Sequence, residues 1–303
     1  MKNNILLIMA SEGFLYEGSL YEGYRVIHPF KKCGLIFRLL REFVFRFVPC
    51  LSSLFYNTME IGCRQLNHII VWDPLITQGY LNYIHKSAPA AKIHFIYWNM
   101  VGKASHLKPH KIPSYVTKWT YDEYDARKYN LNLYTTYPYY KLYIKESQKK
   151  VYDVLFVGKD KGRARLLTEL ENNLREKGLT TKFIITKTDR LSRNKKIYSK
   201  EIDYMTLCDL IAQSRAVVNV VMENQEGLTL RDLEYVYQRV KLITTNKSIK
   251  KNRIYHSNNV FVLGEDDIDG IKDFLDLPYQ SLPEDVLKHH EFDSFINEII
   301  CSD

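Results

Sequence analysis

The sequence predicts an α/β protein built from two consecutive domains, each with a parallel sheet. Short apolar runs alternate with amphipathic helical patterns through both halves of the chain, as they do in βαβ units. The length of 303 residues suits two domains of about 150 residues each. With 46% hydrophobic and 26% charged residues, the composition is globular and excludes a disordered or collagen-like chain.

The first half of the chain opens with an apolar run at residues 5–10. This run is too short for a signal peptide and leads into Ser-Glu-Gly, so we expect a buried first strand there. The other strands expected in this half are residues 68–72, 92–98 and 115–119. Helices are expected between the strands, at residues 35–48, 54–64 and 77–86.

The second half repeats the alternation after a charged, Tyr-rich segment at residues 139–150 that has the composition of a linker. We therefore expect an N-terminal domain at residues 1–145 and a C-terminal domain at 151–284, with a tail of about 285–303 packing back on the first. Strands are expected at residues 152–157, 181–186, 216–221, 241–245 and 259–263. Helices are expected at residues 163–177, 204–214, 230–239 and 268–275.

The helix expected at residues 35–48 is the longest apolar stretch of the chain. Arg38, Arg41, Glu42 and Arg46 interrupt it, which is too costly for a membrane span. Two readings remain open. The helix packs in an α/β core, or it lies in a membrane interface with its phenylalanines buried and its arginines on anionic headgroups.

The charge is uneven along the chain. Residues 1–150 carry 20 Lys and Arg against 10 Asp and Glu, whereas the remainder carries 23 against 25. A basic N-terminal half suits an anionic partner, which includes nucleic acid, acidic lipid or a phosphorylated substrate.

Five Cys without paired spacing indicate a reducing compartment. The nucleotide-binding G-x-G-x-x-G and G-x-x-x-x-G-K-[ST] patterns are missing from the sequence.

A basic turn follows the strand expected at the start of the second domain. Gly158 and Gly162 free the backbone, and the start of a helix offers N–H groups to an anion. Lys159, Lys161 and Arg163 add charges that suit phosphate oxygens. The alternative is an ordinary solvated basic turn.

A second candidate site follows the strand expected at residues 216–221. Glu226 and Gly227 fall in the loop after this strand, and Leu228 and Thr229 offer backbone N–H groups at the start of the next helix. Glu234 lies one or two turns into that helix. Two carboxylates flanking a helix start suit an extended ligand such as a nucleotide-sugar. The alternative is a capped amphipathic helix with two exposed glutamates.

These residues resemble the E-x7-E signature of glycosyltransferases with the two-domain GT-B fold, because seven residues separate Glu226 from Glu234. The chain looks like bacterial enzymes that assemble lipopolysaccharide, O-antigen or capsular polysaccharide. The segments that carry this resemblance are residues 119–129, 152–163, 225–231 and 241–246. It implies two Rossmann-like domains whose parallel sheets face a central cleft.

The resemblance also implies roles for the candidate residues. Glu226 would touch the donor sugar and Glu234 the ribose, while Lys159, Lys161 or Arg163 would neutralise the leaving diphosphate. Basic side chains would then take the place of a metal ion, and neither a metal nor another cofactor is expected.

One segment departs from the family pattern. Residues 228–231 replace the Gly/Pro-rich tract of the broader E-x7-E group, which makes Arg231 a further candidate phosphate ligand. The aspartates that could suggest a metal site are expected to cap helices instead. They are Asp122, Asp125, Asp266, Asp267 and Asp269.

An acceptor must be activated, and the candidates lie in the first half after expected strand ends. Glu12 and Asp73 are the principal ones, with Glu17 and His106 beside them, and a structural role is the alternative for each. A retaining reaction would need no such base.

The function expected is transfer of a sugar from a nucleotide-sugar donor to a lipid-linked or saccharide acceptor in bacterial surface polysaccharide biosynthesis. The location expected is the cytoplasm, with peripheral contact at the anionic inner face of the plasma membrane. Alternatives are a GT-B-like transferase of another group, such as glycerol phosphate from a CDP donor, and a noncatalytic donor-binding module. A basic nucleic-acid-binding protein is disfavoured because no nucleic-acid motif accompanies the charge.

Overall fold

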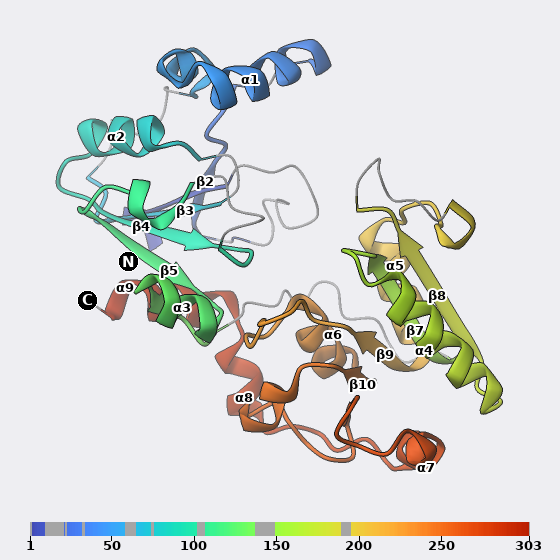
Figure 1. Cartoon of the computed structure of the whole chain (residues 1–303). Helices are drawn as coiled ribbons and strands as arrows, with labels where there is room; N and C mark the ends of the chain where they lie inside the picture. The colour runs from blue at the N-terminus through green and yellow to red at the C-terminus, as the bar shows by residue number, and fades with distance from the viewer. Residues whose placement is uncertain are drawn as a thin grey trace. The chain divides into compact units, whose positions relative to one another are not determined.

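The chain divides into two compact units (Figure 1). Unit 1 comprises Met1–Thr136 and Phe295–Asp303, and unit 2 comprises Tyr137–Ser294. The computed structural model describes residues 2–9, 21, 23–31, 34–57, 65–73, 76–101, 107–136, 149–188 and 195–302.

Six described strands form the sheet of unit 1, and every pairing in it is parallel. The central strands are buried on both faces, which is why they are continuous apolar runs such as Ile-Leu-Leu-Ile. In sheet order the strands are β2 (Arg25–Ile27), β1 (Ile5–Ile8), β3 (His68–Trp72), β4 (Lys92–Tyr97), β5 (Val116–Thr120) and β6 (Asn132–Leu133).

Two of the helices of unit 1 begin at polar caps. α2 (Gln78–Ser87) starts where the Thr77 side chain accepts a hydrogen bond from the Tyr80 N–H. α3 (Glu123–Tyr129) starts where Asp122 accepts one from the Asp125 N–H, which confirms the capping role expected for that aspartate. α1 (Leu35–Phe47) contributes the buried Val44 and the half-buried Phe45 to the same side of the sheet as α2.

The helix expected at residues 54–64 is wrong in the part that the structure describes. A 3-10 helix, η4 (Pro49–Phe55), ends there, and Tyr56 is extended and bridges antiparallel to Phe30. The Tyr56 hydroxyl hydrogen-bonds Ser52 (2.7 Å) and Thr77 (2.8 Å), so tertiary contacts override local helical propensity. Residues 58–64 lie outside the described residues.

The last helix, α9 (Phe292–Cys301), packs largely on unit 1. The Phe295 ring lies 5.8 Å from Trp72 and 5.2 Å from Tyr134, centroid to centroid. Glu298 accepts hydrogen bonds from the backbone N–H groups of Thr135 (2.8 Å) and Thr136 (2.9 Å). The end of the chain therefore covers the sheet face opposite α1 and α2 (Figure 1).

Unit 2 has a sheet of five described strands, again with parallel pairings only. In sheet order they are β11 (Val260–Val262), β10 (Lys241–Thr244), β9 (Ser214–Asn219), β7 (Tyr152–Lys159) and β8 (Thr181–Thr186). The helices are α4 (Ala164–Glu176), α5 (Tyr204–Ala212), α6 (Leu230–Gln238), α7 (Ile271–Asp276) and α8 (Glu284–His289). α4 and α7 share one apolar core with the sheet, and α5 and α6 lie against β9.

The strand order of unit 2 creates a topological switch point. From β7 the chain passes to β8 on one side and then returns to β9 on the other. In open parallel sheets of this kind, ligands bind outside the carboxyl ends of the two strands that flank the switch. This places the expected ligand of unit 2 between the β7–α4 turn and the β9–α6 loop. By the same rule, the switch point of unit 1 lies at the carboxyl ends of β1 and β3.

Candidate functional site

The β7–α4 turn gathers three cations at the carboxyl end of β7. Lys159 ends the strand, Lys161 follows in a left-handed conformation (φ 45°), and Arg163 caps α4. Gly162, at φ 81°, makes the turn possible. The placement of Gly158 in the turn is wrong, because this glycine lies inside β7 opposite Ile185, and its part in donor binding stays a prediction.

Asp160 holds this turn in place. Its carboxylate accepts hydrogen bonds from the Thr188 N–H (3.2 Å), from the Thr188 hydroxyl and from the Tyr198 hydroxyl (2.7 Å). Burial alone would raise the pKa of Asp160, but these donors outweigh it and lower the pKa. The turn is therefore tied to the segment after β8 by a carboxylate that stays ionised.

The three cations repel one another. Burial lowers the pKa of Lys161, and the charges of Arg163 and Lys159 lower it further. Arg163 donates to the carbonyls of Asp160 and Lys159, at 3.1 Å each, and burial lowers its pKa as well. A bound anion would relieve the repulsion between these cations, so the turn is suited to a phosphate group.

The β9–α6 loop lies beside this turn because β9 is the neighbour of β7 in the sheet. Gly227 and Leu228 are buried, whereas Glu226 is half-buried. The Asn246 side chain, just after β10, donates to the carbonyls of Glu226 (3.5 Å) and Gly227 (3.4 Å). The loop is therefore anchored through its backbone at the carboxyl end of the sheet.

α6 begins with a buried polar network. Asp232 accepts hydrogen bonds from the Thr229 N–H (2.7 Å), the Thr229 hydroxyl (2.9 Å) and the Asn219 amide (2.8 Å). The Thr229 N–H that the sequence offers to a phosphate thus points to the Asp232 carboxylate of the capping box. Burial raises the pKa of Asp232, and these donors oppose the increase.

Glu234 is buried, with 1% of its surface exposed, so the alternative of two exposed glutamates on a capped helix is wrong. Its carboxylate pairs with the Arg231 guanidinium and accepts a hydrogen bond from the Tyr204 hydroxyl (2.9 Å). Arg231 also donates to the Val157 carbonyl of β7 (2.9 Å). Burial raises the pKa of Glu234, and the charge of Arg231 opposes the increase. Through the hydrogen bond from Arg231 to Val157, α6 is connected to the strand that carries the cationic turn.

Asp73 follows the end of β3, as the sequence predicts, and the strand order places it at the switch point of unit 1. It is buried, with 2% of its surface exposed. Its N–H donates to the Ile96 carbonyl (3.0 Å). Burial raises the pKa of the neighbouring Tyr97, and the charges of Asp73 and Asp125 raise it further. Glu12, Glu17 and His106 lie outside the described residues.

Within the described part of the chain, no group of three or more His, Cys, Asp or Glu is placed to hold a metal ion. Asp267 instead accepts the Asp269 N–H at the start of η9 (Ile268–Gly270), and Asp266 accepts the Val262 N–H (2.6 Å). No helix among the described residues is long and apolar enough to cross a membrane.

Sequence reasoning missed the residues that support the site. Thr229-x-x-Asp232 has the spacing of a capping box, a signal that the sequence does contain. Asp160 had no such signal, because its partners Thr188 and Tyr198 are 28 and 38 residues away. Tyr204, which contacts Glu234, lies 30 residues from it.

Comparison with known proteins agrees with the fold. No protein-family model and no curated protein matches the chain. A sucrose-phosphate synthase from Thermosynechococcus elongatus matches over 96% of this chain and 96% of its own, with 10% sequence identity and a TM-score of 0.57. The DNA-modifying enzyme β-glucosyltransferase, studied with and without its substrate uridine diphosphoglucose, matches over 98% of this chain and 91% of its own. That match has 12% identity and a TM-score of 0.46.

The fold expected from the sequence is confirmed. The chain is an α/β protein with two parallel, Rossmann-like sheets, and it shares the GT-B fold with the sucrose-phosphate synthase over nearly its whole length.

Proposed function

We propose that the protein is a glycosyltransferase that moves a sugar from a nucleotide-sugar donor to a lipid-linked or saccharide acceptor in bacterial surface polysaccharide biosynthesis. One observation carries the proposal. The cationic turn of Lys159, Lys161 and Arg163 and the anchored loop of Glu226 lie at the two strands that flank the switch point of unit 2. This is where a parallel sheet binds its ligand.

The cations would act on the leaving group. Sugar transfer breaks the bond between the anomeric carbon and the diphosphate oxygen, and negative charge develops on the diphosphate. Lys159, Lys161 and Arg163 would stabilise that charge from fixed positions, because the turn is already held by Asp160. We propose on this ground that the reaction uses basic side chains in place of a metal ion.

The loop and α6 would hold the rest of the donor. Glu226 is half-buried and would accept hydrogen bonds from sugar hydroxyls. Arg231 lies beside β7 and is a further candidate for the diphosphate. Glu234 would reach the ribose hydroxyls only if its ion pair with Arg231 opened, and it positions Arg231 while the pair is closed.

The acceptor would be activated in unit 1. The new bond forms between the anomeric carbon and an acceptor oxygen, whose proton passes to a base in an inverting reaction. Asp73 has the right place at a strand end, and Glu12 follows the first strand in the sequence. We propose that the enzyme works at the cytoplasmic face of the membrane as a peripheral protein, where lipid-linked acceptors are found.

Thermal stabilisation by nucleotides tests the donor site. UDP, GDP, CDP, ADP and dTDP are compared, since a ligand at about a hundred times its dissociation constant stabilises a fold by about 2.7 kcal/mol. We expect one nucleotide to stabilise the wild type and Lys161→Ala to abolish the shift. Lys182→Ala is the control, because Lys182 is an exposed lysine on β8 away from the turn.

Two results would contradict the donor site. One is a wild type that no nucleotide stabilises, and the other is a shift that Lys161→Ala leaves intact. A shift by CDP alone, combined with transfer of glycerol phosphate instead of a sugar, would favour the alternative transferase.

A further inference from the structure

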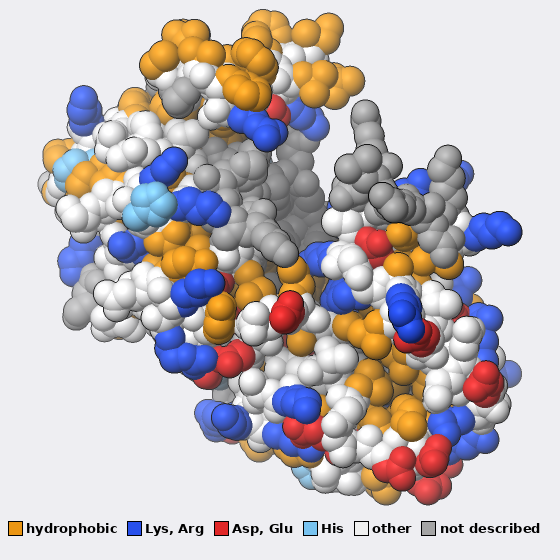
Figure 2. Space-filling model, in the orientation of Figure 1, with side chains coloured by type: hydrophobic (Ala, Val, Ile, Leu, Met, Phe, Trp, Pro, Cys, Tyr) orange, Lys and Arg blue, Asp and Glu red, His pale blue; other side chains and the backbone are white. Residues whose placement is uncertain are grey.

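Helix α1 and η4 form the largest concentration of exposed apolar side chains in the described part of the chain. Fifteen large hydrophobic side chains are exposed across the described residues of both units, and nine of these fifteen lie between residues 35 and 54. We call these nine the apolar platform, and Figure 2 shows hydrophobic side chains gathered over α1. They are Leu35, Ile36, Phe37, Leu39, Leu40, Phe43, Phe47, Leu51 and Leu54.

The apolar side of α1 points away from the core of its own unit. Leu35, Leu39, Phe43 and Phe47 follow one another at intervals of four residues, so they share one face, and each is more than half exposed. A helix that packs only against its own domain turns its apolar face inward. The reading of residues 35–48 as a core helix is therefore wrong for most of this surface.

The inward side of the helix carries an arginine. Val44 is buried there, and the Arg41 guanidinium lies 4.9 Å from the centre of the Phe30 ring with 12% of its side chain exposed. The Phe45 ring packs 5.1 Å from the same phenylalanine. These contacts fix the rotation of the helix, so its outward apolar face is set by packing within unit 1.

Cations border the apolar platform. Arg38 and Arg46 are exposed on α1, and Lys31 is exposed shortly before it. Glu42 is the one acidic residue in the sequence of residues 34–57. The Arg46 guanidinium lies 5.6 Å from the Phe47 ring, so its stem runs along the apolar surface while its charge stays at the edge.

We propose that the apolar platform docks on the surface of an anionic lipid bilayer, with its leucines and phenylalanines among the acyl chains and Arg38, Arg46 and Lys31 on the headgroups. Apolar area combined with basic charge is what binds proteins to anionic membranes. A second copy of the chain fits less well, because a self-complementary contact would bring two sets of these cations together. The inference rests on the proposed peripheral location of the enzyme but not on its donor chemistry.

Vesicle flotation tests the proposal on the full-length chain. Vesicles of phosphatidylcholine alone are compared with vesicles that also contain phosphatidylglycerol. We expect retention on the anionic vesicles to fall by more than about ten-fold in Leu39→Glu/Phe43→Glu. Leu166→Glu/Met205→Glu is the matched control, because both residues are exposed hydrophobics of unit 2 and retention should not change.

A second pair of variants tests the charge. Arg38→Glu/Arg46→Glu should lose the preference for anionic vesicles, as should the wild type when salt is raised from about 0.1 M to about 1 M. Because these side chains are exposed, all variants should keep the wild-type melting temperature and nucleotide stabilisation. A Phe43→Trp variant reports insertion directly, through a blue shift of its fluorescence when anionic vesicles are added.

The proposal is overturned if the wild type is not retained on anionic vesicles, or if Leu39→Glu/Phe43→Glu is retained as well as the wild type. A concentration-dependent dimer that this double variant abolishes, with no vesicle binding by the wild type, would assign the apolar platform to a second copy. Loss of vesicle binding with nucleotide stabilisation intact would leave the donor site standing, so the two proposals fail separately.

Discussion

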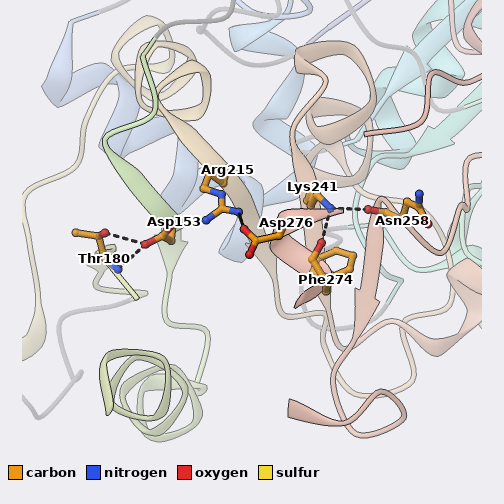
Figure 3. Close-up of polar contacts among 7 residues, drawn as sticks. All are labelled: Asp153, Thr180, Arg215, Lys241, Asn258, Phe274 and Asp276. Atoms are coloured by element: carbon orange, nitrogen blue, oxygen red, sulfur yellow. Dashed lines mark hydrogen bonds and ion pairs between the residues drawn. The ribbon is translucent and has the colours of Figure 1, made fainter. Parts of the chain in front are cut away.

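The buried Lys241 offers the sharpest test of how burial changes a pKa in unit 2 and, through it, the free energy of unfolding. It lies at the start of β10 with 5% of its surface exposed, and its ammonium donates to the carbonyls of Asn258 (2.9 Å) and Phe274 (Figure 3). The nearby carboxylates Asp153 and Asp276 both bind Arg215. Burial, reinforced by the charge of Arg215, lowers the pKa of Lys241 from 10.5 to about 8.

The magnitude follows from that fall in pKa. While Lys241 is protonated in both states, folding carries a penalty of about 3 kcal/mol. Because the folded pKa lies below the unfolded one, the penalty is full below pH 8 and disappears as the pH rises toward 10.5. From pH 7 to pH 9.5, the free energy of unfolding should therefore gain about 2 kcal/mol from this group.

Urea unfolding across this pH range, on wild type and Lys241→Met, measures the effect. The wild-type curve minus the variant curve isolates Lys241, since the other titrating groups are common to both. The difference in free energy of unfolding at a single pH combines two opposing effects. Lys241→Met removes the buried charge, but it leaves two carbonyls without their donor, which costs about 1–3 kcal/mol. Lys182→Met, an exposed lysine on β8, should follow the wild-type curve. A wild type and Lys241→Met with parallel pH profiles would refute the reasoning.

Two further predictions concern the ends of helices. Asp232→Asn keeps the shape of the third helical residue of the capping box but weakens the hydrogen bonds from Thr229 and Asn219. It should lower the free energy of unfolding by about 1–2 kcal/mol and reduce nucleotide stabilisation, and thermal melts with and without nucleotide measure both. An unchanged melt would contradict the buried network. Glu298→Ala removes the acceptor that ties α9 to Thr135 and Thr136 and should cost about 2–3 kcal/mol, with Asn297→Ala, an exposed neighbour, as the control. Hydrogen bonds from both threonines lower the pKa of Glu298 against the effect of burial. The extra free energy of unfolding of the wild type over Glu298→Ala should therefore be present above pH 4.5 and be lost as the pH falls through the lower, folded pKa. Equal acid sensitivity of wild type and variant would count against this prediction.

Much of the fold could be predicted from local pattern. The nine strands expected from apolar runs are all present within two residues of their expected bounds, because buried parallel strands need continuous apolar sequence. The short β2 and β6 were not anticipated, since two or three residues give no periodicity to recognise. The cationic turn could also be found, because Lys159, Lys161 and Arg163 are close in sequence.

The sequence by itself determined the alternation of strands and helices, the caps at Asp122 and Asp267, and the composition of the two loops at the switch point. These features depend on residues a few positions apart. Only the tertiary structure decided that Arg231 reaches the Val157 carbonyl 74 residues away, which draws Glu234 into a buried ion pair. It also decided which side of α1 faces outward. Helical periodicity defines an apolar face, but the packing of Arg41 and Phe45 against Phe30 decides the direction in which that face points.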